Sequence, residues 1–84
     1  MPHVIVKLWP GLPDDSIRDL SDQILESVTA TLGYSTDSVS IAFEEVAPQD
    51  WMERVYAPDI AARWPSLTQR PGYGPGPNPN KPLS

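Results

Sequence analysis

Proline is the second residue of this sequence, and its chemistry depends on what happens to Met1. Methionine is readily cleaved before a small residue such as proline, which leaves the ring nitrogen of Pro2 as a secondary amine. Terminal amines titrate at pH ~7.7–8.0, and an apolar pocket lowers that pKa by disfavouring the charged form. Such an amine can take a proton from a carbon or oxygen beside a carbonyl. The alternative is that Pro2 merely starts the chain.

The segment that would position this terminus is a predicted strand over His3–Leu8. Its residues are mostly β-branched or apolar, with Val4, Val6 and Leu8 on one face. Two prolines and a glycine within residues 9–13 cannot continue a strand, so a loop is expected there.

An amphipathic helix of about five turns is predicted after this loop. Asp14 and Asp15 suit its positive amino end, and Gly33 is well placed to end it. Polar side chains separate the apolar positions, which recur at helical spacing. These positions are Ile17, Leu20, Ile24, Val28 and Leu32.

A second strand is predicted over residues 38–46, where Val39, Ile41 and Phe43 share one face. A strand, a helix of this length and another strand form a unit in which the strands can lie parallel and the helix covers one face. The predicted fold class is therefore α/β, built on a β-α-β subunit whose second sheet face still needs cover.

Two short helical pieces are expected after Pro48, one over residues 50–56 and one from Pro58 to about residue 64. Their aromatic side chains exceed what such a segment buries alone, so we expect packing on another subunit or around a pocket. From Pro71 onward the sequence is rich in proline and glycine. We predict a domain over residues 1–70 and a disordered tail over 71–84, of which residues 74–84 could be removed without loss of assembly or catalysis.

The amino-acid composition argues for an oligomer and against metal, nucleic-acid and membrane binding. A chain of 84 residues without cysteine needs another source of stability, and oligomerisation is the expected one. The lone histidine, His3, cannot supply the roughly four Cys or His ligands of a zinc cage, so we expect no metal site. A net charge of −5 without a basic cluster argues against nucleic-acid binding. No apolar run could span a membrane and no signal peptide is evident, which predicts a cytoplasmic protein.

Several of these features together resemble the 4-oxalocrotonate tautomerase family. They are Pro2 before a strand, a helix ending at Leu32 and Gly33, the run Asp-Ser-Val-Ser-Ile at 37–41, and Trp51. The likeness covers roughly residues 2–73, and its later part is similar to the small dimeric phenylpyruvate-type tautomerases. The resemblance implies a β-α-β subunit whose sheet pairs with that of a second subunit, with the active site at the amino terminus and Pro2 as general base.

The sequence departs from the best-known members at two positions. Leu12 and Ser40 stand where those members carry arginines that hold substrate carboxylates. The departure favours a monocarboxylate, more apolar enol over a dicarboxylate such as 2-hydroxymuconate.

Other groups could bind the substrate instead. Trp51 is expected to keep the pocket dry or to pack in the core. Ser38 and Ser40 could offer donors to a substrate oxygen, or could simply face solvent as strand serines often do. His3 could tune Pro2 or lie at the surface. Lys7 could bind a carboxylate or simply reach solvent. Arg54 and Arg63 could bind the substrate carboxylate across a subunit boundary, or could pair with Glu53 or Asp59.

The sequence thus predicts a cofactor-independent keto-enol tautomerase, a homodimer in the cytoplasm, acting on a phenylpyruvate-like enol or 2-keto acid. Dehalogenation or decarboxylation from the same proline is an alternative that the resemblance leaves open. Those reactions call for arginines and an acidic residue around the pocket. Glu44 and Glu45 could supply the acid, but the two family arginines are replaced by Leu12 and Ser40. A non-enzymatic assembly module is the other alternative.

Overall fold

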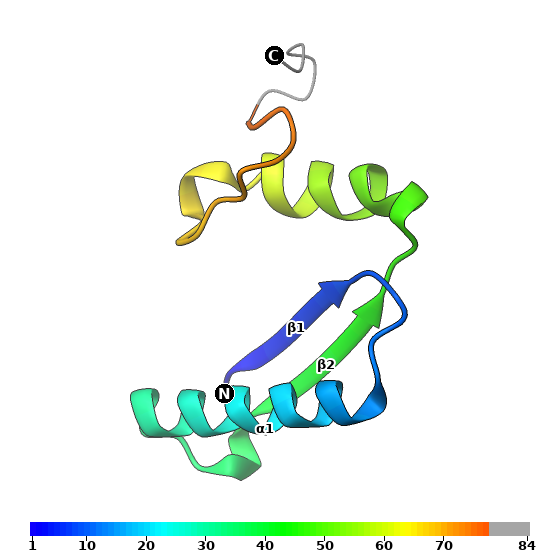
Figure 1. The fold of residues 1–84 in the computed structure, drawn as a ribbon. Coiled ribbons are helices and arrows are strands. Elements are labelled where there is room, and N and C mark those ends of the chain that lie inside the picture. The colour runs from blue at the N-terminus through cyan, green and yellow to red at the C-terminus, as the bar shows by residue number, and fades with distance from the viewer. Residues whose placement is uncertain (78–84) are drawn as a thin grey trace. The chain divides into compact units, whose positions relative to one another are not determined.

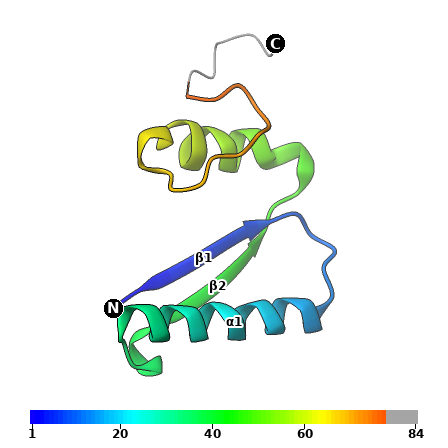
Figure 2. The ribbon, with the colours of Figure 1, turned by 60° about the vertical axis from the view of Figure 1, so that its left-hand side comes forward.

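The computed structural model describes residues 1–77, which fall into two compact units. The first unit is Met1–Glu45, and residues 46–77 are the described part of the second. Figure 1 traces the chain through both units and Figure 2 gives a second view. In chain order the elements are β1 (His3–Leu8), α1 (Asp14–Leu32), η1 (Thr36–Ser38), β2 (Ser40–Glu45), η2 (Pro48–Asp50), η3 (Met52–Ala61) and η4 (Trp64–Ser66).

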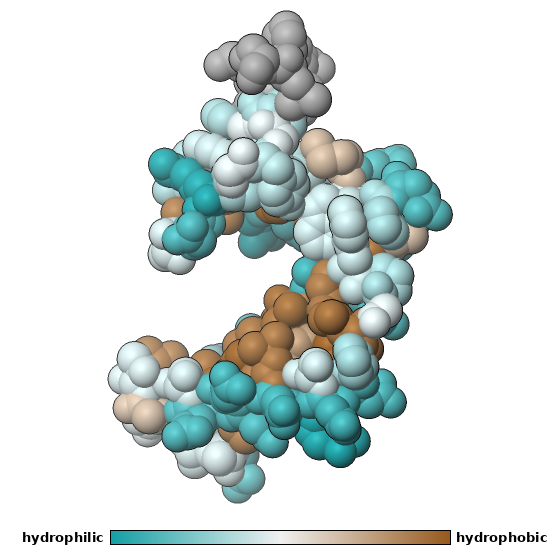
Figure 3. All heavy atoms as spheres, in the orientation of Figure 1, coloured by the Kyte–Doolittle hydropathy of each residue, from teal (hydrophilic) through white to brown (hydrophobic). Residues whose placement is uncertain are grey.

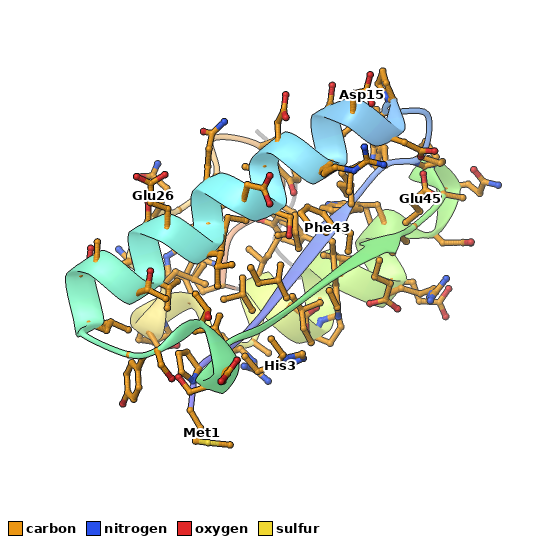
Figure 4. All side chains as sticks on the ribbon, turned by 90° about the horizontal axis from the view of Figure 1, so that it is seen from below. Met1, His3, Asp15, Glu26, Phe43 and Glu45 are labelled. Atoms are coloured by element: carbon orange, nitrogen blue, oxygen red, sulfur yellow. The ribbon has the colours of Figure 1, made fainter. Side chains whose placement is uncertain are left out.

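The first unit is a β-α-β unit, which confirms the predicted fold class. Strands β1 and β2 pair in parallel over six residues each, with His3 opposite Ser40 and Val6 opposite Phe43. The helix lies along one side of the strands (Figures 1 and 2). Figure 4, which looks from below, shows Phe43 between α1 and the strands. Alternate residues of each strand, among them Val4 and Ile41, are half-buried on that face.

Helix α1 has the predicted length and the predicted end. It begins directly after Pro13, and Asp14 and Asp15 occupy its first turn, where acidic side chains interact favourably with the helix dipole. It ends at Gly33, whose φ of 78° is left-handed and whose N–H donates to the carbonyl oxygen of Thr29 at 2.9 Å. A glycine adopts this conformation without the steric cost that other residues meet.

The second strand begins two residues later than the sequence predicts. Ser38 lies in the 3-10 turn η1 rather than in β2, because its hydroxyl and its N–H both donate to the carbonyl oxygen of Ser35, at 2.8 and 3.1 Å. Serine often competes with regular structure by bonding to nearby backbone in this way. The alternation predicted for Val39, Ile41 and Phe43 nevertheless holds, since all three are half-buried.

The two helical pieces expected in the second unit form one π-helix, η3, which runs through Pro58. A proline inside an α-helix clashes with the carbonyl four residues before it and cannot donate. A π-helix bonds each N–H to the carbonyl five residues back, as Ala62 does to Ala57 at 3.1 Å, so the wider turn accommodates the proline ring. The prediction of a break at Pro58 is therefore wrong.

Buried apolar side chains occur only in the second unit among the described residues, at Val46, Val55, Tyr56 and Ala61. The domain boundary at residue 70 and the tail stay predictions, but Tyr73 and Gly76 make specific contacts with Tyr56 that a disordered segment would lack. That residues 74–84 can be removed also stays a prediction, and such a cut would remove Gly76 with its hydrogen bond to Tyr56. The end of the predicted tail, residues 78–84, lies outside the described residues.

The sheet face opposite α1 carries an exposed apolar side chain, Ile5, which keeps 52% of its surface in contact with solvent. Figure 3 shows apolar side chains gathered over the strands. An isolated two-stranded sheet is marginally stable in water, so this unit needs further cover. None of the helices in residues 1–77 has the length and apolar character that a membrane span requires.

Candidate active site

Pro2 is held at the start of the sheet by its own backbone. Its carbonyl oxygen accepts a hydrogen bond from the N–H of Ser40 at 3.2 Å, so strand pairing extends back to residue 2. Pro2 is half-buried, whereas Met1 is 92% exposed. Removal of Met1 would therefore convert the nitrogen of Pro2 from an amide into an amine without taking a packed side chain from the fold.

His3 and Ser40 meet beside Pro2, across the paired strands. The Nδ1 atom of His3 lies 2.6 Å from the hydroxyl oxygen of Ser40, and both residues are exposed. If the imidazole donates in this bond, the serine hydroxyl is left to donate outward; if the hydroxyl donates, the other ring nitrogen of neutral histidine carries the proton. In either tautomer the pair presents one donor beyond its own hydrogen bond, which suits a substrate oxygen.

Lys7 lies farther along the same face of the sheet. Its ammonium nitrogen is 3.9 Å from a carboxylate oxygen of Glu44, which is its cross-strand neighbour. The alternative predicted for Lys7 is that it simply reaches solvent; the structure instead places it beside Glu44 at the surface. An exposed ion pair of this length contributes little to stability, ~0–1 kcal/mol.

The two positions that depart from the family pattern lie in different parts of the first unit. Leu12, 50% exposed, belongs to the loop between β1 and α1. In the same loop the N–H of Gly11 donates to a carboxylate oxygen of Glu45 at 3.4 Å. Ser40 opens β2. Neither site is a fully buried position that would exclude a longer side chain.

The remaining candidates belong to the second unit. Trp51 is half-buried and its indole N–H donates to the hydroxyl oxygen of Tyr73 at 2.8 Å. Arg54 lies within η3 and Arg63 follows it, and both are exposed. The structure thus brings Pro2 close to Ser40 in one unit, and Trp51 close to Tyr73 in the other.

Sequence reasoning missed Tyr73 because the residue lies in a Pro/Gly-rich segment whose composition predicts disorder. The available signal was an aromatic residue between glycines, which is an unusual component of an inert tail. Within residues 1–77 there is no group of three or more His, Cys, Asp or Glu side chains that could hold a metal ion.

Comparison with known proteins places these features in a family. A family profile described as "Tautomerase enzyme" matches residues 2–54, a segment that contains Pro2 and Trp51. The chain belongs to the tautomerase family. It is 42% identical over 74 residues to a "Probable tautomerase" of Xylella fastidiosa (strain 9a5c), a match that covers 88% of this chain and 90% of that protein. It is 34% identical over 74 residues to "Tautomerase PptA" of Pectobacterium atrosepticum, covering 87% and 97%.

A solved structure supports the fold of this tautomerase. The crystal structure of YwhB, a homologue of 4-oxalocrotonate tautomerase, is similar with a TM-score of 0.53 and 33% sequence identity, over 55% of this chain and 75% of that one. The resemblance to the 4-oxalocrotonate tautomerase family is thereby confirmed. The chain is an isomerase of the tautomerase class, and members of this family act on small molecules and form small oligomers. The assembly module without enzymatic activity is set aside.

Proposed function

We propose that this tautomerase interconverts the enol and keto forms of a phenylpyruvate-like 2-keto acid, with the nitrogen of Pro2 as general base. The observation that carries the proposal is the hydrogen bond from the Ser40 N–H to the Pro2 carbonyl, together with the exposure of Met1. The bond holds residue 2 in the sheet, while the side chain that must leave makes little contact with the protein.

The proposed reaction needs one group that carries a proton both ways. The amine of Pro2 takes the proton from the enol hydroxyl, and the oxygen lone pair forms the carbonyl as the carbon–carbon double bond shifts its electrons to the neighbouring carbon. The ammonium of Pro2 then delivers a proton to that carbon. One proton leaves oxygen and one reaches carbon, so the amine is regenerated and no redox step occurs. A base with a pKa near the working pH performs both transfers well.

The departures at Leu12 and Ser40 support a monocarboxylate substrate. Arginine binds carboxylates through two parallel charge-assisted hydrogen bonds, which neither leucine nor serine can make. We propose that Ser40 and its partner His3 partly replace the missing arginines in binding the substrate carboxylate. The donor that this pair has left outside its own hydrogen bond can bind one carboxylate oxygen. A second carboxylate would find no matching arginine at position 12. Trp51 is proposed to contact the apolar part of the substrate. Lys7, Arg54 and Arg63 stay candidates for the carboxylate.

The assembly proposed for this enzyme is a homodimer. In the first unit no side chain is fully buried, and Ile5 lies exposed on the face of the sheet that α1 leaves open. Burying such a side chain against a second subunit would stabilise the assembly by the hydrophobic effect.

The experiment that tests this function follows the ketonisation of phenylenolpyruvate by ultraviolet absorbance, with the mature protein and with Pro2→Ala. We expect a rate well above that of buffer, and a collapse of kcat/KM in the variant because alanine replaces the secondary ring amine with a primary amine that can rotate about its N–Cα bond. We also expect 2-hydroxymuconate to react with lower kcat/KM than phenylenolpyruvate. A rate indistinguishable from buffer with both substrates would refute the proposal and favour another reaction of the family.

A further inference from the structure

We propose that residues 73–76, which we call the C-terminal clasp, hold the indole of Trp51 in its working orientation, so that Tyr73 is a positioning residue of the substrate pocket. The role in the reaction rests on the proposed function, in which Trp51 contacts the substrate. The contacts that build the clasp lie entirely within the second unit and do not depend on that function.

The base of the clasp is Tyr56, a residue of η3 with only 1% of its surface exposed. Its hydroxyl accepts a hydrogen bond from the N–H of Gly76 at 2.8 Å and donates to the carbonyl oxygen of Tyr73 at 3.3 Å. Both bonds therefore go to the same short segment, one at each end. A buried hydroxyl that lost these partners would be destabilising, which gives the segment a strong reason to stay in place.

The middle of the clasp lies directly on the ring of Tyr56. Gly74 has a φ of 88°, and a Cβ atom at this position would overlap the ring carbons and hydroxyl of Tyr56. Only glycine satisfies both the left-handed backbone and the close approach. Gly76 also has a left-handed φ, of 82°, and is buried. The glycines that made this segment look disordered are the residues that let it close over Tyr56.

The clasp reaches Trp51 through one side chain. The ring of Tyr73 lies 5.5 Å from that of Tyr56, tilted by 54°, in the range of favourable aromatic pairs. Its hydroxyl oxygen accepts the hydrogen bond from the indole N–H of Trp51 at 2.8 Å. Because indole has a single donor and no acceptor, this bond is the one polar contact that can fix the orientation of Trp51.

In the proposed reaction, Trp51 and its partner Tyr73 serve substrate binding, whereas Pro2 carries out the proton transfers. If Trp51 contacts the apolar part of the substrate, a loose indole would weaken binding while leaving the proton transfers at Pro2 unchanged. Loss of the Tyr73 hydroxyl should therefore raise KM and leave kcat nearly constant, which is the pattern for an interaction equal in the ground and transition states.

The test compares Tyr73→Phe with Tyr34→Phe in the full chain. Tyr34 is a matched control because it is also a half-exposed tyrosine, 45% against 49%, but lies in the first unit outside the clasp. The indole N–H resonances are recorded by nuclear magnetic resonance and that of Trp51 is assigned with Trp51→Phe. In Tyr73→Phe we expect this resonance to shift, and KM for phenylenolpyruvate to rise about threefold to tenfold, the effect of one lost hydrogen bond. Tyr34→Phe should change neither.

Two results would overturn the proposal. An unchanged Trp51 resonance in a folded Tyr73→Phe protein would show that the clasp does not fix the indole. A shifted resonance with unchanged KM would refute the role of Tyr73 in substrate binding. The unmodified protein gives an independent check, since the Trp51 N–H should exchange with deuterium more slowly than that of Trp9, which is 58% exposed. Equal exchange would also contradict the clasp, and this readout is unaffected if Pro2 proves not to be the base.

Discussion

The N–H of Ser40 donates to the carbonyl oxygen of Pro2 at 3.2 Å, which joins the first residue of β2 to the residue just before β1. The position of Pro2 is therefore set by strand pairing rather than by Met1, which is 92% exposed. The same residue, Ser40, holds His3 through its side chain at 2.6 Å. Ser40 thus positions Pro2 through its backbone and His3 through its side chain.

The hydroxyls of Ser40 and Ser38 should behave differently when each is replaced by alanine. Ser40→Ala removes the proposed donor to the substrate, so we expect KM for phenylenolpyruvate to rise about twofold to tenfold with little change in kcat. Ser38→Ala removes the hydrogen bond to the carbonyl oxygen of Ser35, the residue just before η1, and should lower Tm by a few degrees while KM stays constant. A KM for Ser40→Ala equal to that of the unmodified enzyme would exclude the Ser40 hydroxyl from substrate binding.

The first unit was largely predictable because its signals are local. The strand over His3–Leu8 follows from alternation, and the end of α1 follows from Gly33, whose left-handed backbone the structure contains. The start of β2 was not predictable from alternation, because the hydrogen bonds of Ser38 to Ser35 favour a turn over a strand at that residue. Pairing between subunits leaves no local trace in the sequence and stays a prediction.

A charge on the open face of the sheet should weaken the proposed dimer. Ile5→Lys places an ammonium group where Ile5 would be buried between subunits, and burying an unpaired charge is costly. We expect a smaller species by light scattering after size-exclusion chromatography. Gln23→Lys, which introduces the same residue at an exposed polar position of α1, should leave the assembly unchanged. A dimer that persists in Ile5→Lys would place the interface elsewhere.

Glycine at position 74 should be required for the stability of the second unit. Gly74→Ala imposes a left-handed conformation on alanine, at about 1–2 kcal/mol, and adds an overlap with Tyr56. Gly72→Ala is the control, since a Cβ there meets no atom within 4 Å. Thermal unfolding followed by circular dichroism should show a clearly lower Tm for Gly74→Ala alone. Identical Tm values for the two variants would contradict the contact.

The second unit was less predictable because its structure depends on contacts between distant residues. Pro58 predicts a helix break from local rules, yet the i to i+5 hydrogen bonds of η3 accommodate its ring. Proline and glycine after residue 70 predict disorder by composition, yet Gly74 and Gly76 allow the chain to close over Tyr56. The sequence identified Trp51 as a candidate but could not indicate its partner Tyr73, which is 22 residues away.

The most direct test of the central claim is to block the nitrogen of Pro2 without altering any described residue. A chain with one alanine inserted between Met1 and Pro2 should lose its methionine and keep the alanine, which intact mass would verify, so that the Pro2 nitrogen remains an amide. We predict that this protein has the circular dichroism spectrum of the mature enzyme but ketonises phenylenolpyruvate no faster than buffer. Turnover equal to that of the mature enzyme would contradict the assignment of Pro2 as the base.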